Sequence, residues 1–221
     1  MSAGVQAFHD DSLAVAVRGF LHSPEHISGR GLVLTHGAGS NSNTSLLIAL
    51  ADSFATAGFS VLRCDLPFRQ NRSFGPPRPG DAERDREGLR SALAAMRKLG
   101  CDQVFLGGHS YGGRQATMLC AEDVDLAAGL LLLSYPLHPP RKPAQLRVQH
   151  LPGLQVPALF VHGTRDPFGS VEEIEAALKM IAAKTQLLVV DGAGHDLGFK
   201  GKSVRAGLAG EVVAAFAGFF R

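Results

Sequence analysis

The sequence is poor in cysteine, in excess charge and in long apolar runs. Its three cysteines are too few and too widely spaced for a disulfide framework or a zinc site, and we expect them as reduced thiols in or near the core: Cys64, Cys101 and Cys120. The formal net charge is only +2, and no basic run is interleaved with aromatic residues. We therefore expect no nucleic-acid partner, no metal and no cofactor.

Membrane and secretion signals are lacking as well. The longest apolar run, around residues 127–133, is far shorter than the roughly 20 residues that a membrane-spanning helix requires. The amino terminus carries Asp10 and Asp11 and has no basic segment followed by an apolar core, which argues against a signal peptide. We expect a cytoplasmic protein without a membrane partner, folded as one domain over residues 1–221.

Apolar segments of strand length alternate with segments of helical character. Seven strands are predicted, the first of them antiparallel and at an edge: residues 13–21, 31–35, 60–65, the run from 104, 130–133, 158–162 and 187–190. Helices are predicted between them, over residues 44–57, 81–99, 112–121, 171–183 and 203–219, with a loop over 66–80. This alternation predicts an α/β protein with a mostly parallel, doubly wound sheet of about seven strands and helices on both faces.

One predicted strand ends in a serine between glycines. The apolar run from Val104 leads into the sequence GHSYGG over residues 108–113, which is typical of a sharp turn from a buried strand into a helix. Such a turn holds Ser110 in a strained conformation that lifts its hydroxyl clear of the sheet, while the glycines permit close packing. Ser110 is therefore a candidate nucleophile.

Two other predicted strands end in groups that can activate a serine. The strand over residues 158–162 leads to Asp166, and the strand over residues 187–190 leads through a glycine-rich loop to His195. A serine hydroxyl needs a base to remove its proton and a third group to orient that base. The chain order serine, aspartate, histidine, each at the carboxyl end of a strand, is the order found in α/β-hydrolases.

A developing negative charge on the substrate also needs donors. The strand over residues 31–35 ends in His36-Gly37-Ala38-Gly39, a small-residue loop that exposes its backbone amides. We predict an oxyanion hole made by the backbone N–H groups of Ala38 and Tyr111, the second helped by the helix N-terminus that begins there.

Other polar residues at strand ends have plainer interpretations. Asp196 is an alternative to Asp166, but it directly follows His195, and adjacent residues rarely form the hydrogen bond to the ring nitrogen. The strand over residues 130–133 is followed by residues 134–137, which contain no carboxylate, and this favours Asp166 further. Three histidines lie beside glycine at strand ends, where an imidazole typically braces a loop: His36, His109 and His162.

Only residues 134–156 separate the strand after the serine turn from the strand before Asp166. We therefore expect no large cap domain and a comparatively open site, roofed by residues 66–80 and 138–154. Six arginines are expected there or nearby, namely Arg69, Arg72, Arg78, Arg114, Arg141 and Arg165. They are consistent with a solvated basic rim or with an anionic substrate group, because guanidinium groups bind carboxylate and phosphate with two hydrogen bonds.

Several segments together resemble a known family. These are residues 36–39, the serine turn over 108–113 followed by Arg114, and the sequences SYPLHPP, HGTRDPFG and GAGHD over residues 134–140, 162–169 and 192–196. They resemble the bacterial branch of an α/β-hydrolase-like family whose eukaryotic relatives include a nuclear non-specific-lethal complex subunit and testis-expressed homologues. Dienelactone hydrolases and small carboxylesterases are similar more distantly. The resemblance runs from about residue 31 onward and implies the α/β-hydrolase fold and a triad of Ser110, Asp166 and His195.

The preferred interpretation is a serine hydrolase that cleaves a carboxylic ester or thioester of a small acyl substrate through an acyl-enzyme. The alternative is a non-catalytic binding or scaffold protein on a hydrolase fold, because a fold does not fix a function. A nucleotide-binding domain is a third interpretation, since Gly37 and Gly39 open a helix and Asp65 ends the next strand, but Ser42 stands where the fingerprint requires a third glycine. The sequence is also compatible with a homodimer through a sheet edge or the apolar C-terminal helix.

Overall fold

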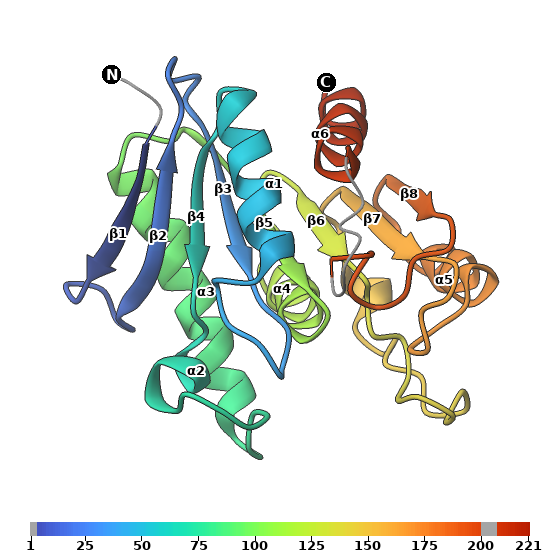
Figure 1. The fold of residues 1–221 in the computed structure, drawn as a ribbon. Coiled ribbons are helices and arrows are strands. Elements are labelled where there is room, and N and C mark those ends of the chain that lie inside the picture. The colour runs from blue at the N-terminus through green and yellow to red at the C-terminus, as the bar shows by residue number, and fades with distance from the viewer. Residues whose placement is uncertain (1–3, 200–206) are drawn as a thin grey trace.

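The computed structural model describes residues 4–199 and 207–221. They form one eight-stranded sheet in the order β1-β2-β4-β3-β5-β6-β7-β8 (Figure 1). The strands are β1 Gly4–Asp10, β2 Val17–Ser23, β3 Arg30–Thr35, β4 Ser60–Cys64, β5 Gln103–His109, β6 Leu130–Leu133, β7 Ala158–Gly163 and β8 Thr185–Val190. Strands β1, β2 and β4 pair antiparallel and all other neighbours pair parallel, so the sheet is mostly parallel, as predicted.

The antiparallel edge differs from the prediction. The first strand was expected over residues 13–21 at an edge, but β2 begins only at Val17 and lies between β1 and β4. The edge is formed by β1, for which no strand was predicted. Most β1 residues are exposed on both faces of this outer ribbon, so the segment lacks the alternation of buried and exposed side chains that marks a strand in a sequence.

Helices cover both faces of the sheet. Helices α1 Ser45–Thr56 and α6 Leu208–Phe219 pack on one face, and α3 Asp81–Lys98, α4 Tyr111–Glu122 and α5 Val171–Leu178 on the other (Figure 1). Successive strand residues point to opposite faces, so β3 to β7 each contribute to both cores. In β3, for example, Leu32 and Leu34 belong to the α1 and α6 core, while Val33 belongs to the α3 and α4 core.

Helix ends follow local chemistry. The Thr44 side chain accepts a hydrogen bond from Leu47 N at 3.4 Å and caps α1, where the sequence offers Asn43 or Thr44 as the cap. Ser170 and Glu173 form a capping box at the start of α5. Helix α5 was predicted to end at residue 183, but it ends at Leu178. The amides of Met180 and Ile181 donate to the carbonyls three residues earlier, so the chain continues in tighter turns. The C-terminal helix was predicted from residue 203, but residues 203–206 lie outside the described residues, and α6 begins at Leu208.

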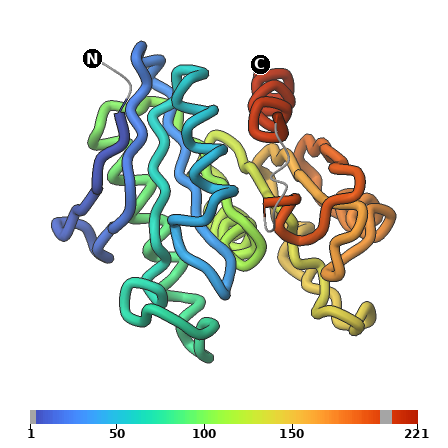
Figure 2. Tube along the Cα trace, in the orientation of Figure 1, coloured from blue at the N-terminus to red at the C-terminus, as the bar shows by residue number. Residues whose placement is uncertain are grey.

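Two loops project from the edge of the sheet at which the parallel strands end. Figure 2 shows residues 66–80 and the connection from β6 to β7 at the same edge. The first contains a short helix, α2 Pro67–Asn71, where only a loop was predicted. The second contains one 3-10 turn, Leu151–Gly153, and no cap domain, as expected. Within the described part of the chain, no helix combines the length and apolar character needed to cross a membrane.

Candidate active site

Ser110 lies at the junction of β5 and α4 in a backbone conformation that is unusual for serine. Its φ is 52° and its ψ is −116°, in a region that side chains with a Cβ rarely adopt. The turn is held by the Ser110 amide, which donates to Leu133 O at 2.8 Å on the neighbouring strand β6. The hydroxyl is thereby presented at the carboxyl edge of the sheet.

Glycines on both sides of Ser110 make this turn sterically possible. A Cβ on Gly108 would lie 2.5 Å from Gly113 N, and one on Gly112 would lie 2.6 Å from His36 O. Both contacts are with backbone atoms, which cannot move aside as a flexible side chain would. The strand and the helix therefore approach each other as closely as they do only because these positions lack side chains.

Three side chains from separate strand ends meet beside this turn. His195 Nε2 lies 2.8 Å from Ser110 Oγ, and His195 Nδ1 lies 2.8 Å from Asp166 Oδ2 and 3.0 Å from Oδ1. Neutral imidazole can donate from one nitrogen and accept at the other. With the proton on Nδ1, His195 donates to Asp166 and accepts from the Ser110 hydroxyl.

Asp166 is enclosed by the protein. Its side chain is 0% exposed, and its Oδ1 also accepts a hydrogen bond from Phe168 N at 2.9 Å. The Phe168 ring stacks on the His195 ring, with centroids 4.1 Å apart and an interplanar angle of 29°. Carboxylate and phenyl ring thus fix the plane of the imidazole from its edge and from its face.

The loop after β3 is held in one conformation by hydrogen bonds to the Gly37 carbonyl. That oxygen accepts from His36 Nδ1 at 2.9 Å, and from Ser40 N and Ser40 Oγ at 3.2 Å each. Since a peptide unit is planar and trans, a fixed Gly37 carbonyl also fixes the opposite direction of the Ala38 N–H. Ala38 and Tyr111, the two predicted oxyanion donors, both line the pocket that contains Ser110.

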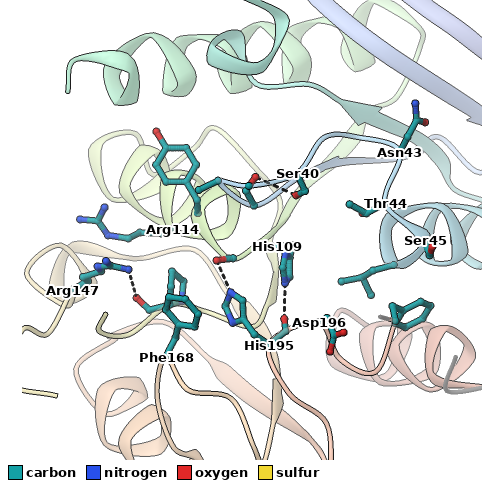
Figure 3. Close-up of a pocket in the computed structure, with 18 residues that line it drawn as sticks. Ser40, Asn43, Thr44, Ser45, His109, Arg114, Arg147, Phe168, His195 and Asp196 are labelled. Carbon is teal, nitrogen blue, oxygen red and sulfur yellow. Dashed lines mark hydrogen bonds between the residues drawn. The ribbon is translucent and has the colours of Figure 1, made fainter. Parts of the chain in front are cut away.

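This pocket has a volume of about 720 Å³, within the range of small-molecule sites. Its lining comes from the loop after β3 and the start of α1, the serine turn and α4, the connection from β6 to β7, and the loops that carry Phe168 and His195 (Figure 3). Among the described residues, the predicted roof over 66–80 contributes none of the lining, which corrects that expectation. The side chains Arg69 and Arg72 of that segment instead bind backbone carbonyls and Asp81 of the protein itself.

The comparisons with known proteins agree with this architecture. The sequence model of a family described as "Alpha/beta hydrolase domain" matches residues 28–216, most of the chain. The chain belongs to the α/β-hydrolase family. The match does not test the narrower resemblance to the family of the non-specific-lethal complex subunit.

Solved structures show the same fold. Dienelactone hydrolase from Anabaena variabilis has a TM-score of 0.76 and 20% identity, covering 100% of this chain and 98% of that chain. XC6422 from Xanthomonas campestris, an α/β serine hydrolase without lid, has a TM-score of 0.73 and 15% identity, covering 98% of this chain and 95% of that chain. TT1662 from Thermus thermophilus has a TM-score of 0.72 and 24% identity, covering 100% of this chain and 98% of that chain.

The three histidines that lie beside glycine at strand ends hold loops in place in this α/β-hydrolase, in line with their plainer interpretation. His109 Nε2 lies 2.7 Å from His195 O and so braces the loop that carries the imidazole. His36 Nδ1 donates to Gly37 O, and its Nε2 accepts from Leu66 N at 3.1 Å. Burial lowers the pKa of His36, so the ring stays neutral and can donate from Nδ1 while accepting at Nε2. His162 contacts Gly169 O at 2.8 Å through Nε2.

The alternative acids have other partners. Asp196 also lines the pocket, and its Oδ1 accepts from Gly198 N at 3.1 Å, while Asp166 is the acid hydrogen-bonded to His195. Asp65, the acid of the nucleotide-binding interpretation, accepts from Ser42 N at 2.7 Å and so braces the loop after β3. Among residues 4–199 and 207–221, no group of three or more His, Cys, Asp or Glu is arranged to hold a metal ion. The cysteines are free thiols, all buried, as predicted.

Sequence reasoning missed Asp85 as a supporting residue. Asp85 lies on α3, is fully buried, and accepts from Tyr111 Oη at 2.8 Å and from Phe68 N at 3.0 Å. It thereby ties the first residue of α4 and the helix α2 to α3. Burial raises the pKa of Asp85, and burial together with Asp85 raises the pKa of Tyr111. The position reads as one acid among several on an amphipathic helix, so the sequence carries no signal for this contact.

Proposed function

We propose that the protein is a serine hydrolase that cleaves a carboxylic ester or thioester of a small acyl substrate. The observation that carries this proposal is the chain of hydrogen bonds from Ser110 Oγ through His195 to Asp166, within a pocket of about 720 Å³. A scaffold needs no such alignment of a hydroxyl, an imidazole and a buried carboxylate, whereas nucleophilic catalysis does.

In the first half of the reaction, Ser110 Oγ attacks the carbonyl carbon of the substrate. His195 Nε2 accepts the hydroxyl proton as the bond forms, and Asp166 stabilises the resulting imidazolium while holding its orientation. The tetrahedral intermediate then collapses. His195 returns the proton to the leaving oxygen or sulfur, which departs as an alcohol or a thiol, and the acyl group remains on Ser110.

In the second half, a water molecule takes the place of the leaving group. His195 accepts a proton from this water as its oxygen attacks the acyl carbon. Collapse of the second tetrahedral intermediate breaks the bond to Ser110 Oγ, which regains its proton from His195. The products are a carboxylic acid and the free enzyme, so protons and electrons balance over the cycle.

The negative oxygen of both intermediates needs two donors. We assign them to the backbone amides of Ala38 and Tyr111, the first oriented by the fixed Gly37 carbonyl and the second lying at the N-terminus of α4. One such donor contributes on the order of 3 kcal/mol to transition-state stabilisation. Both positions act through the main chain, so their side chains are free to serve other contacts.

Turnover of a short-chain 4-nitrophenyl ester tests this proposal. We expect Ser110→Ala to lower kcat by about 10⁴-fold or more, because the nucleophile is lost while the fold is kept. Ser73→Ala, which changes an exposed serine outside the pocket, is the matched control and should leave kcat and KM unchanged. Equal rates for Ser110→Ala and wild type would overturn the proposal.

The scaffold alternative makes an opposite set of predictions. It requires that no member of a broad panel of esters and thioesters is turned over, and that a partner protein co-purifies with the chain. That pair of results would replace the hydrolase proposal by the scaffold proposal.

A further inference from the structure

Two arginine side chains lie together on one side of the reactive residues. Arg114 is in the first turns of α4, four residues after Ser110, and Arg147 belongs to the connection between β6 and β7. Both line the pocket, and Figure 3 shows them side by side, with Asp196 on the opposite side of His195. Arg147 was not among the arginines singled out in the sequence, although Arg141 of the same connection was.

Neither arginine forms an ion pair with another described residue. Among the residues that the structure describes, no carboxylate lies within 4.0 Å of either guanidinium, although other arginines have such partners, as in the pairs Arg72–Asp81 and Arg90–Asp123. Arg147 Nη1 makes one long hydrogen bond of 3.3 Å to Pro136 O. Arg114 Nε is buried and, within the described part of the chain, lacks a hydrogen-bond partner. An unpaired buried donor costs free energy, so an acceptor brought in by a ligand would stabilise this site.

The two cations also repel each other. Burial and the charge of Arg114 lower the pKa of Arg147, and the same charge adds to burial in lowering the pKa of His150 to about 4. This end of the pocket therefore has a positive potential. Asp196, the one acid among the described lining residues, lies on the other side of His195 (Figure 3). An anion bound between the two guanidinium groups would remove the repulsion and satisfy their free donors.

We infer that Arg114 and Arg147 bind an anionic group of the substrate, so that the preferred substrates are esters or thioesters that carry a carboxylate or phosphate near the scissile bond. This inference rests on the proposed hydrolase function and names its substrate class. Guanidinium groups suit the task because their planar donors match both kinds of oxyanion.

The position of Arg114 limits the size of these substrates. Four helical residues correspond to a rise of about 6 Å, so Arg114 lies roughly one turn along α4 from the serine turn. Long side chains on a helix lean toward its N-terminus, so we infer that only a few carbon atoms separate a carbonyl at Ser110 from an anion at Arg114. Acyl groups of succinate or glutarate size satisfy this requirement.

A matched pair of esters tests the inference. The first is the mono-4-nitrophenyl ester of glutaric acid, with a free carboxylate, and the second is its neutral methyl ester. We expect wild type to prefer the anionic ester by about ten- to hundredfold in kcat/KM, as expected for charge-assisted hydrogen bonds. Arg114→Gln and Arg147→Gln should each lose most of this ratio. Arg141→Gln, an exposed arginine of the same connection that does not line the pocket, should retain the full ratio.

Conservative variants separate charge recognition from folding. Arg114→Lys and Arg147→Lys keep the positive charge but lose the planar pair of donors, so each should keep part of the preference. Competitive inhibition of neutral-ester hydrolysis by glutarate and by inorganic phosphate distinguishes the two anions. The stronger inhibitor identifies the group that the arginines bind, and its inhibition should weaken in Arg147→Gln.

Failure of this inference can be told apart from failure of the proposed function. If Ser110-dependent hydrolysis occurs and the anionic ester is not preferred, or the ratio is the same in the double variant Arg114→Gln/Arg147→Gln, the inference is wrong and the hydrolase proposal stands. If no ester is hydrolysed, calorimetric titration with glutarate and phosphate decides. Binding by wild type that is lost in the double variant supports the anion site, and absence of binding by wild type overturns it.

Discussion

At the scale of the residue, Arg69 shows how a buried charge can shape a catalytic loop without touching the substrate. Its side chain donates to Ser40 O at 2.8 Å and to Ala38 O at 3.1 Å in the loop after β3, and to Gly75 O at 2.8 Å in its own segment. The residue is only 7% exposed. Because one rigid guanidinium ties several carbonyls together, it holds the loop that presents the Ala38 amide.

We predict that Arg69→Gln lowers kcat by about tenfold or more with little change in KM. The loop would lose its anchor, and a displaced oxyanion donor weakens only the transition state. The backbone amides of residues 37–43 should also exchange faster with deuterium. Arg78→Gln, an exposed arginine of the same segment, is the control. Unchanged kcat with unchanged exchange would show that Arg69 is not the anchor.

The limits of sequence reasoning at this scale follow from the kind of partner involved. Ser110, Asp166 and His195 could be predicted to converge because each follows a strand in a parallel sheet, whose carboxyl ends meet at one edge. The partners of Arg69 are backbone carbonyls, which carry no sequence signature, and Arg147 reaches the pocket from a long irregular connection. Sequence patterns indicated a basic rim, but not which arginines line the pocket.

At the scale of the element, the turn between β5 and α4 depends on the contact between strand and helix. Gly108 and Gly113 allow the backbones of β5 and α4 to approach closely. The chain must turn from strand to helix within this short distance, and the turn gives Ser110 its positive φ. Nothing in the catalytic chemistry requires these glycines directly. The close packing of strand and helix requires the glycines, and the strained backbone of Ser110 is a consequence of that packing.

Gly108→Ala should therefore destabilise the protein by about 1–3 kcal/mol, since the added Cβ would lie 2.5 Å from Gly113 N. Gly210→Ala in α6 is the matched control, because a Cβ there meets nothing within 4 Å. Alanine is the better helix former, so this control should be neutral or stabilising by up to about 1 kcal/mol. Urea unfolding of both variants measures the difference, and equal stabilities would contradict this account of the turn.

Element boundaries were predictable where a cap or a buried alternation marks them. Helix α1 follows its Thr44 cap, and β3 to β7 are apolar runs buried on both faces. Strand β1 was missed because its side chains are mostly exposed, and α2 was missed among prolines. In both cases tertiary pairing, and not a local pattern, stabilises the element.

At the scale of the whole molecule, neutral histidines are built into several parts of the structure. Arg63 Nε donates to His22 Nε2 at 2.7 Å, and Leu66 N donates to His36 Nε2 at 3.1 Å, so a proton on either nitrogen would break a hydrogen bond. Burial lowers the pKa of both, and burial with the Arg114 charge lowers the pKa of His150 from 6.5 to about 4. The unfolded chain thus binds more protons than the folded chain below about pH 6.5.

The free energy of unfolding should accordingly fall as the pH is lowered from about 6.5 toward 4, and be regained as the pH rises. His150→Gln cannot take up a proton but keeps a donor for Thr117 Oγ1, now 2.8 Å from His150 Nε2. Its stability should therefore depend less steeply on pH in this window. Urea unfolding at several pH values measures both slopes, and identical slopes would refute the role of His150.

Both ends of the sheet leave an edge strand, β1 and β8. Unpaired strand edges are common sites of association between copies of a chain. The homodimer considered from the sequence stays a prediction, and light scattering or analytical ultracentrifugation of the purified protein would test it.

The proposed activity requires that His195 makes the hydroxyl of Ser110 reactive at neutral pH. Labelling with a fluorophosphonate probe at pH 7, followed by mass-spectrometric location of the adduct, measures this reactivity. We predict one adduct on Ser110 in wild type and a rate of labelling that falls by several orders of magnitude in His195→Gln. An adduct on another residue, or undiminished labelling of Ser110 in His195→Gln, would contradict the account.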